Sequence, residues 1–406
     1  MSSEGSSGPS TATSAVGRKK GSISAFLNNS YYRGIIFQAL TIALIVGFVW
    51  WVVGNTVTNL AERNIASGFG FLNSTAGFSI NFSLIEYSEE STHGRVLLVG
   101  LLNTILCAAL SIFFATIIGF VVGVGRLSSN WLVRKLSAAY VEIVRNVPLL
   151  LIILFVYIAV LQVLPSPRNS FSLFGDFFWN NRGLVTPQPV FESGSGLIFF
   201  VFIAALVMSF FVRMWARKRQ METGAQFPVF YTALGLIIGL PVITYFLAGQ
   251  PISFVFPELK GFNFVGGINI VNELLALVIA LSMYTASYIA EIVRAGILSV
   301  SHGQTEAAYS LGLSPGKTTR LIVIPQAMRL IIPPLTSQYL NLTKNSSLAA
   351  AIAYPELVSV FAGTSLNQVG QAVEVLSITM AIYLSLSLLT SLLMNWYNAS
   401  MALKER

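Results

Sequence analysis

Residues 301–315, SHGQTEAAYSLGLSP, form a polar stretch between two long apolar runs. The pattern predicts a short helix from about 304 to 311. Glu306 in its first turn suits the positive end of the helix dipole. Gly312 suits the left-handed position after the helix, and Pro315 prevents the helix from continuing. Two residues can cap the start of this helix: Ser301 or Thr305.

The predicted helix carries small side chains on one side. Leu311 lies three residues after Ala308 and four after Ala307, so the three share a face. Small side chains let the surface of another protein approach the backbone closely. A short helix of this kind between two membrane spans predicts a docking element. The alternative is an ordinary helix in a surface loop.

The rest of the chain has the composition of an all-α polytopic membrane protein. Of its 406 residues, 54% are hydrophobic and only 10% are charged, whereas a soluble globular protein carries roughly 25% charged residues. Apolar runs of nearly the length needed to cross a bilayer recur along most of the chain. We expect about eight spans, at roughly 35–53, 97–124, 138–164, 196–214, 227–248, 270–290, 322–343 and 372–397.

The N-terminal part precedes this core. A Ser/Gly/Thr-rich segment that ends in a basic cluster predicts a disordered cytoplasmic tail over 1–30. No small-x-small cleavage site follows the apolar run 35–53, so we expect an uncleaved signal-anchor helix. Residues 31–95 then hold this extra first helix and an extracytoplasmic segment.

The basic residues predict the orientation. With the N-terminus inside, 18 of the 24 Lys and Arg residues fall on the cytoplasmic side and 6 on the other, which is the bias of the positive-inside rule. Both termini are therefore expected in the cytoplasm, with the chain in a bacterial inner membrane. The same bias accounts for the net charge of +8 without a nucleic acid partner.

The chain offers little for catalysis or for metal binding. One cysteine, Cys107, can form neither an internal disulfide nor a thiolate metal site, and His93 and His302 lie far apart. We expect no catalytic residue, metal or cofactor here. Residues 312–318, GLSPGKT, resemble a phosphate-binding loop, but three residues separate the glycines where the pattern needs four. ATP and Mg²⁺ are therefore expected in a separate subunit.

The polar stretch resembles the coupling loop of ABC importer permeases, which carry the pattern E-A-A-x3-G-x9-I-x-L-P. The matching residues are Glu306, Ala307, Ala308, Gly312, Ile322 and Pro325. Only Ile324 departs, in place of leucine. The resemblance implies that a cytoplasmic coupling helix within 302–320 sits in a groove of an ATPase dimer and transmits its closure to the spans. It also implies an extracytoplasmic binding protein that delivers the substrate.

Three further segments resemble the histidine/glutamate/glutamine/arginine/opine permease family: 140–150, 288–296 and 342–349. This resemblance implies a type I importer permease core in two parts, 96–164 and 270–400. Between them we expect an insertion over 165–269 with an outside loop and two membrane helices.

The extra first helix and the insertion resemble the long permease subunits of general L-amino-acid transporters. This layout implies that the substrates are polar L-amino acids or a broader range of L-amino acids. It also implies a second, related permease as a heterodimer partner, with a homodimer as the alternative.

Two Glu-Ile-Val-Arg segments place opposite charges three residues apart at cytoplasmic helix ends. They are Glu142 with Arg145 and Glu291 with Arg294. Each pair is either a local salt bridge that neutralises charge near the bilayer, or part of an inner gate or a brace for the coupling helix.

The seventh predicted span contains Pro325, Pro333 and Pro334, which predict a break because proline removes a backbone donor. Broken helices at mid-membrane often form substrate sites. We expect a substrate path lined by Asn341, Lys344, Asn345 and Ser346. Lys344 can offset the carboxylate of an amino acid; the alternative is that it snorkels outward.

Together these features favour a permease that works by alternating access, driven by ATP in its partner. A secondary transporter or a channel is the alternative, and it would need no docking helix. A membrane enzyme would need clustered acids, histidines or a nucleophile at one membrane face, and the sequence has none.

Overall fold

A computed structural model describes residues 30–62 and 67–401. They divide into two compact units, one up to Gly68 and one from Phe69 onward. The described part of the first unit is essentially one helix, α2 (Ser30–Glu62), which is long and apolar enough to cross a membrane. The predicted tail over 1–30 lies outside the described residues, apart from Ser30.

Six helical stretches of the described chain are long and apolar enough to cross a membrane. They are α2, α3 (His93–Gly125), α6 (Ser195–Thr223), the continuous stretch of α7 (Val229–Leu234), η4 (Gly235–Gly239) and α8 (Leu240–Leu247), α9 (Asn272–Leu298) and α14 (Ala372–Met401). Six of the eight predicted spans are therefore confirmed as apolar helices.

The third predicted span, 138–164, is wrong as a single helix. It divides into α4 (Trp131–Asn146) and a second helical stretch made of α5 (Leu149–Leu154) and η2 (Phe155–Leu161). The two are bent by 107°, and together they would count as a seventh span. Pro148 causes the bend because proline forces the residue before it out of the helical conformation. Val147 is accordingly extended, with φ −99° and ψ 130°.

The seventh predicted span, 322–343, forms a helix that is not among those six. α11 (Pro315–Thr318) and η5 (Thr319–Val323) lead into α12 (Ile324–Asn345). α12 is less apolar because it carries charged and amide side chains along its length. It also continues through Pro333 and Pro334, so the predicted proline break is wrong. Buried neighbours of the prolines, Ile331, Ile332 and Leu335, anchor this turn in the core and favour continuation of the helix.

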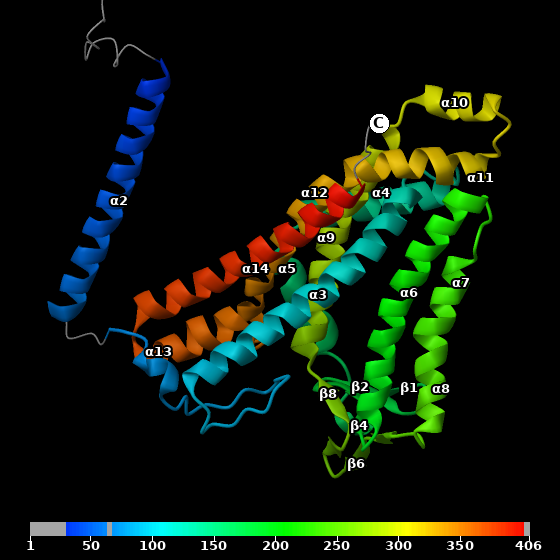
Figure 1. The fold of residues 1–406 in the computed structure, drawn as a ribbon. Helices are drawn as coiled ribbons and strands as arrows, with labels where there is room; N and C mark the ends of the chain where they lie inside the picture. Colours follow the sequence, from blue (N-terminus) through cyan, green and yellow to red (C-terminus); the bar gives the residue numbers. More distant parts are fainter. Residues whose placement is uncertain (1–29, 63–66, 402–406) are drawn as a thin grey trace, which may run out of the picture. The chain divides into compact units, whose positions relative to one another are not determined.

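The centre of the second unit is the crossing of α3 and α9 (Figure 1). The two backbones come close because α3 presents glycines to α9 at the crossing. A Cβ added at Gly119 would lie 2.6 Å from the Ile289 side chain, and one added at Gly123 would lie 2.8 Å from the Ala290 carbonyl oxygen. Close approach through small residues is the usual way membrane helices gain packing contacts.

The insertion contains strands that the sequence analysis did not predict. Its four-stranded antiparallel sheet joins β1 (Phe171–Leu173), β2 (Phe177–Asn180), β3 (Gly183–Thr186) and β8 (Ile268–Ile270). Two smaller pairs are β4 (Gln188–Phe191) with β5 (Ile252–Val255) and β6 (Glu258–Lys260) with β7 (Asn263–Val265). The short helix η3 (Pro167–Asn169) precedes them. The strands lie at the end of α9 opposite to the loop that follows it (Figure 1).

The remaining elements connect the long helices. η1 (Gly70–Asn73) precedes α3, and α10 (His302–Ser310) follows α9. η6 (Ser346–Ile352), η7 (Val358–Ser365) and α13 (Leu366–Val369) join α12 to α14. The turn between η6 and η7 is packed into the core, since Tyr354 and Leu357 are fully buried. The membrane part of the fold is thus all helical, as predicted.

Candidate functional site

The helix predicted from the polar stretch is α10, and its C-terminal end is as expected. Gly312 has φ +76°, the left-handed conformation that favours glycine. The Gly312 N–H donates to the Tyr309 carbonyl at 2.9 Å, and the Leu313 N–H donates to the Ala308 carbonyl at 3.1 Å. These two bonds form a Schellman motif. Pro315 then occupies the first turn of α11.

The start of α10 differs from the expectation. The helix begins at His302, two residues early, and the side chain of Ser301 makes no capping hydrogen bond. Glu306 therefore lies in the middle of the helix rather than in its first turn. The Gln326 amide donates to the Gln304 side chain at 3.2 Å, which ties α10 to α12.

The predicted small-residue face is divided between outside and inside. Glu306, Ala307 and Leu311 are exposed, whereas Ala308 is only 3% exposed. Ala308 therefore belongs to the inner face of the loop and is not accessible to a partner. The exposed surface at α10 includes Glu306, Ala307, Leu311 and Gly312.

Of the two predicted charge pairs, the structure forms one. The Arg294 Nε donates to Glu291 Oε1 at 3.1 Å. Glu291 also pairs with Arg126, which ends α3. The carboxylate thus joins α3 to α9 seven residues before the end of α9, the helix that leads to α10. The sequence alone does not indicate the pair between Arg126 and Glu291, because the two residues come from helices far apart along the chain.

The pair Glu142 and Arg145 is not formed. The Arg145 guanidinium lies over the Tyr288 ring at 4.9 Å from its centroid, and no ion pair of Glu142 is seen among the described residues. Glu142, Arg145 and Glu291 nevertheless line one hollow of about 430 Å³, together with Arg126 and Tyr288. The structure therefore brings three of the four predicted gate or brace residues to one place.

The four predicted path residues differ in exposure. Asn341 and Lys344 are exposed, Asn345 is half-buried, and Ser346 is fully buried with its hydroxyl donating to the Thr343 carbonyl at 2.7 Å. Of these four, Lys344 lines a hollow on the described part of the chain. This hollow of about 430 Å³ is also lined by Ser347, Val358, Thr379, Met380, Tyr383, Leu384 and Ser387.

The Lys344 hollow, as we name this space, is mainly apolar with one cation. No ion pair of Lys344 is seen in the part of the chain that the structure describes. A small molecule with a carboxylate and an apolar body would match this wall. The sequence did not point to Tyr383 or its neighbours on α14, because they repeat the ordinary composition of a membrane helix.

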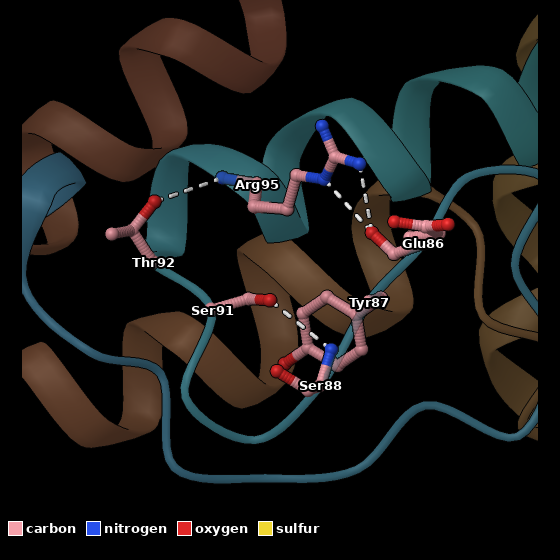
Figure 2. A pocket seen from close by; sticks show the side chains of 6 residues that line it. All are labelled: Glu86, Tyr87, Ser88, Ser91, Thr92 and Arg95. Atoms are coloured by element: carbon pink, nitrogen blue, oxygen red, sulfur yellow. Dashed lines mark hydrogen bonds between the residues drawn. The ribbon is translucent and has the colours of Figure 1, made fainter.

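A further hollow lies on the segment before α3 (Figure 2). Arg95 donates from Nε and Nη2 to the Glu86 carbonyl at 3.0 and 2.8 Å, and the Ser88 N–H donates to Ser91 Oγ at 3.1 Å. Burial and the nearby Glu89 carboxylate raise the pKa of Tyr87, whose hydroxyl donates to the Phe78 carbonyl at 2.7 Å. These bonds fold the segment onto α3, which accounts for the polar groups of this hollow.

Comparison with known proteins agrees with this arrangement. The family described as "Binding-protein-dependent transport system inner membrane component" matches residues 115–403. The chain is 56% identical over 375 residues to the general L-amino acid transport system permease protein AapQ of Rhizobium johnstonii, covering 92% of this chain and 94% of the relative. It is 39% identical over 415 aligned positions to the glutamate/glutamine/aspartate/asparagine transport system permease protein BztB of Rhodobacter capsulatus, covering 95% and 97%. The chain therefore belongs to the family of binding-protein-dependent inner membrane components, the permease subunits of ABC importers.

Proposed function

We propose that this permease translocates a broad range of L-amino acids, polar ones among them, into the cytoplasm. The observation that carries the proposal is the 56% identity to a general L-amino acid permease along 92% of the chain. The exposed α10, with Gly312 in its left-handed turn, supplies the docking element that such a permease needs. ATP and Mg²⁺ are bound by a separate ATPase subunit.

In this proposal, α10 transmits the closure of an ATPase dimer to the membrane helices. α10 contacts α11 and η5, and the Gln304–Gln326 bond ties it to α12. α9 leads directly into it, and the Glu291 carboxylate braces α9 against Arg126 of α3. A displacement of α10 therefore moves α3 and α9, the two helices that cross at the centre of the fold, as alternating access requires.

The substrate path follows the end of α12. Lys344 offsets the substrate carboxylate in the Lys344 hollow. Asn341 and Asn345 lie beside it on α12 along the path, and Ser346 is buried at the start of η6. The hollow is open, which suits a protein that must release what it receives. Selection among amino acids then rests mainly with the extracytoplasmic binding protein.

The complete transporter contains a second, related permease, with a homodimer as the alternative. The chain lies in a bacterial inner membrane with both termini in the cytoplasm. This orientation puts α10 on the side of the ATPase and the strands of the insertion on the outside. Reporters fused after Arg406 or within 216–226 are expected to read cytoplasmic, and reporters within 70–90 or 170–190 extracytoplasmic.

The test is reconstitution of the permease with its ATPase, partner permease and binding protein, followed by uptake of a panel of labelled L-amino acids. ATP-dependent uptake of several amino acids, lost when the binding protein is omitted, is the expected result. Uptake without ATP would favour a secondary transporter or a channel. Failure of the permease to co-purify with an ATPase would contradict the docking role of α10.

A further inference from the structure

The structure holds one fully buried carboxylate beside the Lys344 hollow. Glu356 is 0% exposed. Its Oε1 accepts from the Ser359 N–H at 2.7 Å, and its Oε2 accepts from the Val358 N–H at 2.8 Å. Oε2 also accepts from the Tyr383 hydroxyl at 3.0 Å. Glu356 thereby connects the start of η7 to the middle of α14.

The hydrogen bonds around Glu356 favour its ionised form against the cost of burial. Both oxygens receive bonds from N–H or O–H donors. Donors of this kind favour the charged form and offset the cost of burial. No cation pairs with Glu356 in the part of the chain that the structure describes. An ionisable group placed among membrane helices in this way is a candidate for function.

Glu356 is one hydrogen bond from two residues that line the hollow, Val358 and Tyr383. Lys344 lines the same hollow. The space therefore has an unpaired ammonium on its surface and an unpaired carboxylate just behind its wall. This pair of charges matches the two charged ends of a zwitterion, with the ligand carboxylate toward Lys344 and the ligand ammonium toward the Tyr383 wall.

We propose that Glu356 is a positioning residue for the transported amino acid. It acts through Tyr383: it fixes the ring against the hollow and gives that wall a negative potential, so that the α-ammonium end of the substrate faces it. The inference rests on the proposed function, because it takes the Lys344 hollow as the substrate site. It goes further by assigning a basis for preferring amino acids to plain carboxylates.

A purely structural role is the competing explanation, since Glu356 also caps the first N–H groups of η7. The two roles differ in what they predict for ligands. A cap that is lost weakens all ligands together or destabilises the protein. A lost orienting charge weakens only the ligand that carries an ammonium group.

The experiment measures binding to the purified permease–ATPase complex in lipid nanodiscs, without the binding protein. The probes are L-leucine and 4-methylpentanoate, which differ only by the amino group. The wild type is expected to prefer leucine by at least about tenfold, because a charge behind a low-dielectric wall is weakly screened. Glu356→Gln is expected to remove most of that preference, and Glu356→Asp to retain it.

Lys344→Gln is the control that separates the two proposals. It is expected to weaken both ligands by a similar factor and to leave their ratio unchanged. If it weakens neither, or if the wild type binds neither ligand, the Lys344 hollow is not the substrate site and this inference fails with it. If Lys344→Gln weakens both ligands but Glu356→Gln leaves the ratio unchanged, only the role of Glu356 is refuted.

Should Glu356→Gln fail to give a stable complex, Tyr383→Phe takes its place. That change keeps the ring and both backbone bonds of Glu356, and it removes the hydroxyl that bonds the carboxylate to α14. A reduced leucine preference in this variant supports the proposal, and an unchanged preference overturns it.

Discussion

The coupling segment, residues 302–323, and the Lys344 hollow differ in how their parts are spaced along the chain. α10, α11 and η5 follow one another, and their geometry is set locally by the turn at Gly312. The hollow is instead assembled from the end of α12, the starts of η6 and η7, and the middle of α14. A motif made of consecutive residues can be recognised from their spacing, whereas a site built from distant segments can be recognised only once the fold is known.

The two regions also differ in what surrounds their key residues. At the coupling segment Glu306 and Ala307 are exposed and accessible to a partner. At the hollow the carboxylate of Glu356 is fully buried behind the wall. Changes in the first region should therefore disturb the response to ATP without altering ligand preference. Changes in the second should do the reverse.

Gly312→Asp gives the largest expected effect. A Cβ in the left-handed conformation costs about 1 kcal/mol or more, and the new charge would lie on the docking surface. Uptake is expected to fall to background while the protein stays in the membrane. Uptake assays with immunoblots of the membrane fraction measure both quantities.

Gly316→Asp is the matched control for this change. Gly316 is also exposed, a Cβ there would meet nothing within 4 Å, and its φ is not positive. It adds the same charge four residues later without the backbone strain, so a milder loss is expected. Normal uptake by Gly312→Asp would contradict the assignment of α10 as the coupling helix.

Glu291→Gln should have the next largest effect. Like Gly312→Asp, it should change the response to ATP rather than ligand preference. The change leaves the guanidinium groups of Arg126 and Arg294 without the carboxylate that joins them. The group is partly exposed, so we expect a loss of about 1–2 kcal/mol of local stability. Uptake should fall several-fold, with the order of preference among amino acids unchanged. A changed order of preference would place Glu291 in the substrate path instead.

The same contrast explains how much of the fold could be predicted. The end of α10 and the position of Gly312 were confirmed, because a Schellman turn needs only the residues that form it. The bend at Pro148 was missed even though the proline is visible, because the long apolar run around it favours a single helix. Conversely, α12 continues through Pro333 and Pro334 because buried neighbours hold the turn.

Long-range pairing accounts for most of what the sequence did not show. β3 pairs with β8, which lies at the other end of the insertion, with Leu184 opposite Ile270. Strands of three or four residues are also too short to show a clear alternation of apolar and polar residues. Glu291 was expected to pair within its own helix, and it does, but its bond to Arg126 depends on the crossing of α3 and α9. The walls of the Lys344 hollow depend in the same way on α14.

Asn345→Ala should have a smaller effect, and it tests the region of the Lys344 hollow. Asn345 is half-buried at the end of α12, next to Lys344. Removing its amide is expected to slow uptake about twofold to threefold or to shift substrate preference, consistent with the loss of a single uncharged hydrogen bond. The amount of ATPase that co-purifies should not change.

Cysteine substitution gives an independent measure of the same segment. After Cys107 is replaced, cysteines at 341 and 345 should react with a small water-soluble thiol reagent. A cysteine at 346 should not react, because Ser346 is fully buried. If neither 341 nor 345 reacts in any nucleotide state, the segment is a packed or lipid-facing helix surface and the substrate path lies elsewhere.

Glu142→Gln should have the smallest effect, and this makes it the sharpest test of the brace. Glu142 and Glu291 stand in matching Glu-Ile-Val-Arg segments and line the same hollow. Sequence alone therefore gives them equal weight. In the structure Glu291 joins two arginines, whereas Glu142 has no ion pair among the described residues and its carboxylate is accessible to solvent.

Exposed, unpaired charges contribute little to stability, so uptake by Glu142→Gln should stay within a factor of two of the wild type. A loss equal to that of Glu291→Gln would mean that Glu142 gains a partner in another state of the transport cycle, and the hollow would then act as a gate rather than as a fixed brace.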